Sequence, residues 1–125
     1  MVNFKGISLL LLRLAIAAIF LVHGLPKFIG FPSGVMGAFE GMGFPGFLGP
    51  IVAVVEVASA ILLLLGLWTR WPSYALIVVM LVAIFGVHLS EGFSANVERN
   101  MLVIVGLLVI SAFGPGTWAI SRKQE

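Results

Sequence analysis

The 125-residue chain is 61% hydrophobic, only 10% charged, and has a mean hydropathy of +1.19, well above that of an ordinary soluble domain. Its net charge of +2 comes from scattered basic residues, which excludes a nucleic-acid patch, and the lack of cysteine excludes disulfides, thiolate nucleophiles, iron–sulfur ligation and c-type haem attachment. We expect an integral membrane protein with a single domain over residues 1–125.

Four long apolar runs predict four membrane-spanning helices. They cover about residues 7–28, 47–67, 73–89 and 98–113, and each approaches the roughly 20 residues that cross a bilayer. Pro26, in the last turn of the first run, is expected to bend that helix, and Gly114-Pro115-Gly116 ends the fourth. The predicted fold class is an all-α membrane protein, a four-helix bundle.

The segment between the first two runs, residues 29–46, differs from them in composition. It is rich in Gly, Pro and Phe, so it is not a spanning helix, yet it is too apolar for an ordinary hydrated loop. Val35, Met36, Phe39 and Met42 fall on one side at helical spacing. We expect a short amphipathic helix at the membrane surface, as a lipid-facing connector or as a lid.

The distribution of basic residues predicts the orientation of the chain. Four spans place both termini on one side, and the segments on that side carry Lys5, Arg70, Arg122 and Lys123. All three tryptophans fall there too, two of them in a tight turn at residues 68–72. Because short cytoplasmic segments are enriched in Lys and Arg, both termini are predicted to be cytoplasmic.

A hexapeptide occurs twice, as AIFLVH at residues 18–23 and as AIFGVH at residues 83–88. The first and third helices are expected to run in the same direction, so His23 and His88 should lie at a similar depth in the outer part of the bilayer. A parallel internal duplication would explain the repeat. Chance similarity between apolar segments is the alternative.

Arg13 and Glu56 lie inside apolar runs, where an ionisable group is costly unless it is paired or hydrated. Their expected depths differ by less than the reach of an arginine side chain if the first two helices are neighbours. The sequence therefore allows a buried Arg13–Glu56 pair, with either a structural or a functional role. Alternatively, Arg13 extends to the cytoplasmic surface.

The two histidines, with Lys27 and Glu98 at nearby depths, predict a polar pocket. Histidines there could bind a quinone carbonyl or a headgroup, relay protons, or ligate a metal or haem iron, although no further ligand stands at metal-site spacing. Structural alternatives are a hydrogen bond from each histidine to a neighbouring helix, a Lys27 that reaches the outer surface, and a Glu98 that favours a helix N-terminus. Asn100 points one step further into the membrane.

Several motifs together resemble the DoxX family of small bacterial membrane proteins, over nearly the whole chain. They are LLLRLAIAAIFLVHGLPKF, the turn of sequence EVASA at residues 56–60, LLLLGLWTRW, AIFGVHLSEGF, Glu98 with Asn100, and the Gly-Pro-Gly ending. Ser59-Ala60 depart from the glycine-rich pair usual in that family. The resemblance implies a multi-pass inner-membrane protein linked to quinone-reducing oxidoreductases.

The resulting hypothesis is a quinone-linked oxidoreductase subunit, with a quinone as the favoured cofactor and b-type haem or a metal as weaker ones. The alternatives are a small proton-linked carrier and a non-catalytic scaffold. Expected partners are membrane lipids, a redox subunit or a second copy, and not nucleic acid. The candidate catalytic residues are His23, His88 and Lys27, and the candidate cofactor-binding residues are His23, His88, Arg13, Glu56, Glu98 and Asn100.

Overall fold

The computed structural model describes residues 3–88, 95–116 and 119, and every element within them is helical. The long helices are α1 (Phe4–Gly24), α3 (Leu48–Leu65), α4 (Arg70–Ala83) and α5 (Ala95–Phe113). The short ones are the 3₁₀ turn η1 (Leu25–Phe28), the helix α2 (Ser33–Gly41) and the π-helical turn η2 (Ile84–His88). The all-α fold class is confirmed.

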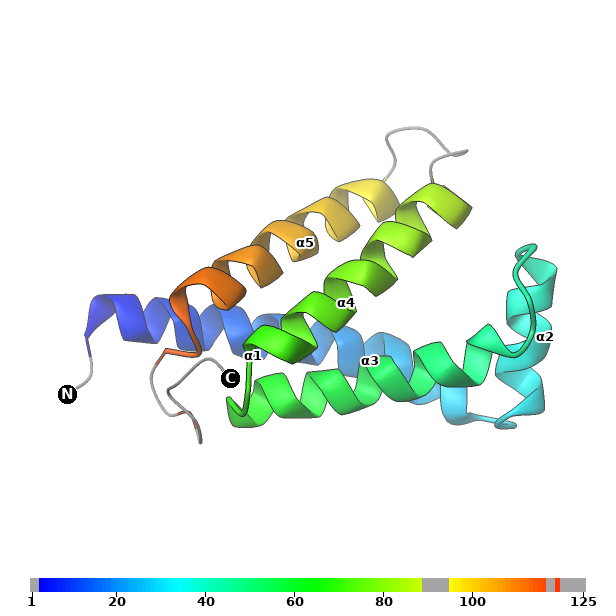
Figure 1. The fold of residues 1–125 in the computed structure, drawn as a ribbon, viewed down its shortest axis with the longest axis horizontal. Helices are drawn as coiled ribbons and strands as arrows, with labels where there is room; N and C mark the ends of the chain where they lie inside the picture. The colour runs from blue at the N-terminus through cyan, green and yellow to red at the C-terminus, as the bar shows by residue number, and fades with distance from the viewer. Residues whose placement is uncertain (1–2, 89–94, 117–118, 120–125) are drawn as a thin grey trace.

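The long helices pack in a ring, because α1 and α4 each contact both α3 and α5. Chain direction alternates around this ring, so α1 and α4 run the same way (Figure 1). At the end of the ring where α2 packs on α3, the α4–α5 pair diverges from the α1–α3 pair (Figure 1). One apolar core joins all four helices and contains Ile16, Ala17, Phe20, Ala60, Leu63, Leu76, Val103, Leu107 and Ile110.

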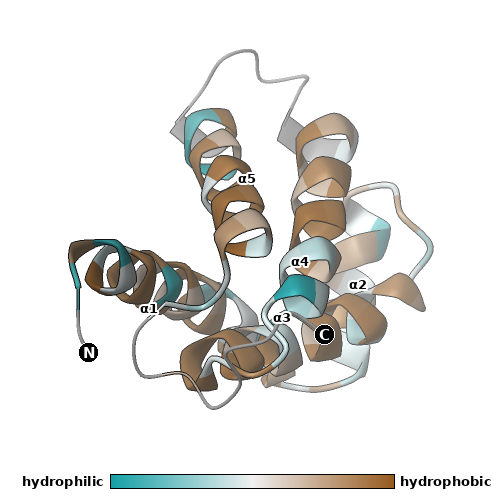
Figure 2. Ribbon diagram, turned by 60° about the vertical axis from the view of Figure 1, so that its left-hand side comes forward, coloured by the Kyte–Doolittle hydropathy of each residue, from teal (hydrophilic) through white to brown (hydrophobic). Residues whose placement is uncertain are grey.

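The outside of the bundle is apolar as well, and little of the helical ribbon is hydrophilic (Figure 2). Val78 and Leu102, for example, are 60% and 75% exposed. Such an exterior is typical of a surface that faces lipid. Among the described residues, Phe4–Phe28 and Leu48–Leu65 are each long and apolar enough to cross a bilayer, and Arg70–Gly86 is apolar but shorter.

The end of α1 changes its helical type at the predicted bend. The α-helix stops at Gly24, and η1 carries the chain through Pro26 to Phe28. Gly24 also lies close to α3, because a Cβ built there would be 3.0 Å from Val57 Cγ2 and 3.5 Å from Glu56 Cβ. The last turn of α1 is therefore tied closely to the middle of α3.

The amphipathic helix is confirmed as α2, which buries Val35 and Phe39 on one face. Three predicted starts were late, however, and the first of them is that of α1, which begins at Phe4 rather than Ile7. α4 begins at Arg70 rather than Ser73, because Pro72 belongs to its first turn, where proline is well tolerated. α5 begins at Ala95 rather than Glu98.

The two copies of the hexapeptide have different backbones. Residues 18–23 continue the α-helix of α1, whereas residues 84–88 form the π-helical turn η2. Gly86 occupies the place of Leu21 in the second copy, and a Cβ at Gly86 would collide with the ring of Phe44. The aromatic ring from the segment after α2 thus packs on η2, and the smaller residue makes room for it.

Candidate functional site

A cavity of about 390 Å³ lies where the two helix pairs diverge, and α2 contributes to its wall. Its lining comes from all five α-helices and is mostly aliphatic and aromatic, including Phe20, Phe39, Met42, Val79 and Val103. A volume of this size is typical of small-molecule sites. Five polar side chains interrupt the apolar lining: His23, Lys27, Glu56, Arg99 and Asn100.

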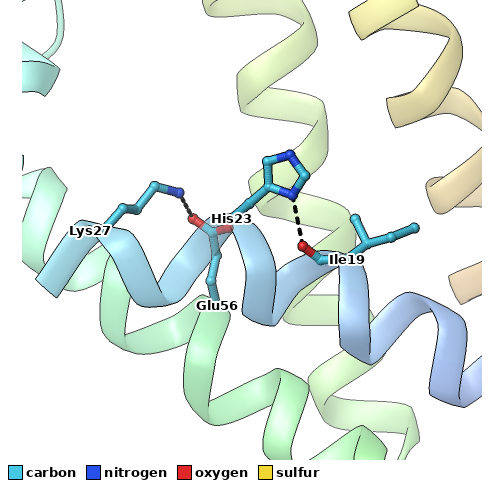
Figure 3. A network of polar contacts seen from close by, with 4 residues as sticks. All are labelled: Ile19, His23, Lys27 and Glu56. Atoms are coloured by element: carbon cyan, nitrogen blue, oxygen red, sulfur yellow. Dashed lines mark hydrogen bonds and ion pairs between the residues drawn. The ribbon is translucent and has the colours of Figure 1, made fainter.

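Lys27 and Glu56 form an ion pair at this cavity, with Lys27 Nζ donating to Glu56 Oε1 (Figure 3). The Glu56 side chain is only 3% exposed, whereas the Lys27 side chain is 30% exposed. The close approach of α1 to α3 at Gly24 and the tight turn of η1 bring the lysine to the carboxylate. Lys27 therefore folds back onto α3 instead of extending to the surface.

The expected partner of Glu56 was Arg13, and this pairing was wrong. Arg13 is buried and donates from Nη1 to the carbonyl oxygen of Pro115 at 2.8 Å. The antiparallel register of α1 and α3 places Arg13 beside Gly66, ten residues beyond Glu56, which is about 15 Å along a helix. Arg13 consequently lies at the opposite end of the bundle from the cavity.

His23 is an exposed side chain that also lines the cavity, so it lies at the cavity mouth. Its Nδ1 is 2.8 Å from the carbonyl oxygen of Ile19, one turn earlier on α1 (Figure 3). A carbonyl oxygen only accepts, so the ring must carry its proton on Nδ1, and in the neutral ring Nε2 is then an acceptor. His23 can thus accept a hydrogen bond from a ligand hydroxyl.

The α5 wall of the cavity differs from the sequence-based expectation. Arg99 and Asn100 line the cavity, whereas Glu98 is exposed and is not among the lining residues. Residues 99, 100 and 103 share one face of α5 at helical spacing. This spacing could have identified Arg99 as a candidate beside Asn100, but Arg99 was not among the candidates predicted from the sequence. The side chain of His88 lies outside the described part of the structure.

The family relationship rests on a model that matches two thirds of the molecule. The DoxX family model matches residues 8–89, from α1 through η2. The chain belongs to the DoxX family. The matched region contains His23, Lys27 and Glu56, while Arg99 and Asn100 of the same cavity lie beyond it on α5.

Three similar proteins have names that describe a cellular location or an activity. A Bacillus subtilis protein named "Putative oxidoreductase CatD" is 32% identical over 86% of this chain and 80% of its own length. Two Escherichia coli proteins are named inner membrane proteins: YphA is 32% identical over 95% of this chain and 91% of its own, and YqjF is 26% identical over 98% and 95%. No solved structure is significantly similar. The chain is therefore a membrane protein of the DoxX family.

Proposed function

We propose that this DoxX protein is a subunit of a quinone-linked oxidoreductase in the bacterial inner membrane. In this proposal α1, α3, α4 and α5 all cross the bilayer, both termini are cytoplasmic, and the quinone binds in the cavity. The membrane location is supported by the names of the Escherichia coli relatives, and the redox role by the name of the Bacillus subtilis relative, "Putative oxidoreductase CatD".

The proposal that the ligand is a quinone rests mainly on one residue, Asn100. Asn100 is 3% exposed, faces the cavity, and has no hydrogen-bond partner among the described residues. Its carboxamide is therefore available at the cavity wall, and a ligand with a polar oxygen would give it a hydrogen-bond partner. A quinone offers two carbonyl oxygens on an apolar ring, which matches a mostly apolar cavity with few polar groups.

A bound quinone would supply two-electron chemistry coupled to protons. On the protein side, Asn100 would donate to a carbonyl oxygen, and His23 would accept from a hydroxyl through Nε2 and exchange its proton with the surroundings. Lys27 would place a positive charge near the headgroup, held in position by Glu56. His88 remains a candidate from its sequence, whereas Arg13 and Glu98 have no part in this cavity.

Native mass spectrometry after release from a mild detergent would test the assignment. We expect the wild-type chain to retain a quinone, and His23→Ala to lower its occupancy about tenfold, because one hydrogen bond to the ligand is lost. Lys5→Gln, an exposed change near the start of α1, is the control and should retain the ligand.

Two results would contradict the proposal. Undiminished quinone in both His23→Ala and His88→Ala would remove the histidines from the site. A wild-type chain that never carries or takes up quinone would leave the proton-linked carrier and the scaffold as the remaining functions, and flux into proteoliposomes would then separate those two.

A further inference from the structure

The cavity has an unbalanced charge. Four of its side chains bear on this balance: Lys27 and Glu56 neutralise one another in their ion pair, and His23 is neutral when it donates to Ile19 through Nδ1 alone. Arg99 is half-buried at the same cavity, and within the described residues no carboxylate pairs with it. Among the described residues that line the cavity, the charge of Arg99 is therefore not compensated by a carboxylate.

Asn100 provides a second, independent sign of a missing group at the same wall. It follows Arg99 directly on α5, is 3% exposed, lines the cavity, and makes no hydrogen bond with another described residue. Carboxamide N–H groups and guanidinium N–H groups are both donors. Both residues can thus donate to an oxygen of a ligand in the cavity, and the guanidinium favours an oxygen that carries negative charge.

We propose that Arg99 and Asn100 form a subsite for an anionic oxygen of the ligand, whose apolar body fills the rest of the cavity. This inference rests on the proposed function and narrows it: the preferred quinone-like molecule carries an ionised hydroxyl or a similar anionic oxygen. The aromatic and aliphatic lining, with Phe20, Phe39 and Val103, contacts the rings. Arg99 is a binding residue that determines specificity for charge.

Two probes of nearly equal shape, one anionic and one neutral, separate the effect of ligand charge on binding from the effect of ligand shape. 2-Hydroxy-1,4-naphthoquinone is ionised at neutral pH, whereas 2-methyl-1,4-naphthoquinone is neutral and has a methyl group in place of the oxygen. Each would be equilibrated with the purified full chain in lipid nanodiscs, and empty nanodiscs would correct for partition into lipid. We expect the anionic probe to bind the wild-type chain about tenfold more tightly than the neutral one.

Substitutions of Arg99 then test whether this side chain causes the preference for the anionic probe. Arg99→Gln should abolish the preference while leaving the affinity for the neutral probe within about threefold, and Arg99→Lys should retain most of it, because the charge remains. Arg99→Met is a second charge-free variant in case the glutamine variant does not fold. Arg70→Gln, the same change at the first residue of α4 and outside the cavity, is the matched control and should behave as the wild type.

The outcomes separate this inference from the proposed function. If both probes bind the wild-type chain equally, or the preference persists in Arg99→Gln and Arg99→Met, the anionic subsite is wrong but the quinone site stands. If neither probe binds, both proposals are overturned together. A preference that disappears only with the charge at Arg99 establishes the subsite.

Discussion

Replacing Lys27 with methionine is expected to lower the free energy of unfolding by about 3 kcal/mol, whereas Glu56→Gln should lower it by only about 1 kcal/mol. The asymmetry follows from burial. Without Lys27, a carboxylate that is 3% exposed loses its partner inside the bundle. Without Glu56, the lysine side chain, already 30% exposed, can extend to the surface.

Reversible unfolding in mixed detergent micelles, followed by circular dichroism, would measure both changes. The double variant Lys27→Met/Glu56→Gln should recover most of the stability lost in Lys27→Met alone, because no charge is then left without its partner. Equal losses in the two single variants would contradict the asymmetry, and additive losses in the double variant would show that the pair does not hold η1 to α3.

Gly66→Ala is expected to lower the free energy of unfolding by about 3 kcal/mol, from left-handed backbone strain and overpacking together. Gly66 ends α3 with φ of 70°, and a Cβ there would lie 2.5 Å from Arg13 Nη1 and 2.8 Å from Ala119 Cα. The arginine side chain can shift at some cost, whereas relief of the contact with Ala119 would require the backbone itself to move. The substitution should therefore separate the end of α3 from α1.

Gly37→Ala is the matched control for this change. Gly37 lies inside α2, and a Cβ there would have nothing within 4 Å, so alanine should be neutral or stabilise the helix by up to about 1 kcal/mol. Thermal unfolding of the two variants side by side, with bound quinone measured in parallel, would test both expectations. Gly66→Ala should leave ligand affinity nearly unchanged, because Gly66 lies at the end of the bundle away from the cavity.

Hydrophobic patterning was sufficient to predict the helices, including the amphipathic α2, and Pro26 marked the place where α1 changes to a 3₁₀ turn, because each feature depends on nearby residues. Helix starts were less accurate. The turn before Ser73 has aromatic and basic residues that suit an interface, but the backbone is already helical from Arg70. Hydrophobic periodicity shows which face of a helix is apolar. It does not show whether a polar turn before the first apolar residue is already helical, so the predicted starts were too late.

The site was predicted only in part, because its assembly depends on register between helices. Depth along each helix made Arg13 and Glu56 plausible partners, but the contact of Gly24 with Val57 sets a register that gives Glu56 to Lys27. Arg99 was missed because it follows Glu98, with which it forms an apparent neutral pair in sequence. On the helix the two residues point in different directions, and only Arg99 reaches the cavity.

The hydrogen bond from Arg13 to Pro115 spans 102 positions of the chain and so bears on biosynthesis. α1 is synthesised first, and if it inserts before its partners, its arginine costs up to about 2.5–3.5 kcal/mol, the value for the centre of a membrane helix. Arg13 cannot complete its contacts until the residues that follow α5 have left the ribosome. This contact between α1 and the segment after α5 therefore forms only once α5 has been synthesised, and until then other partners, such as the insertion machinery or lipid headgroups, must offset the cost of Arg13.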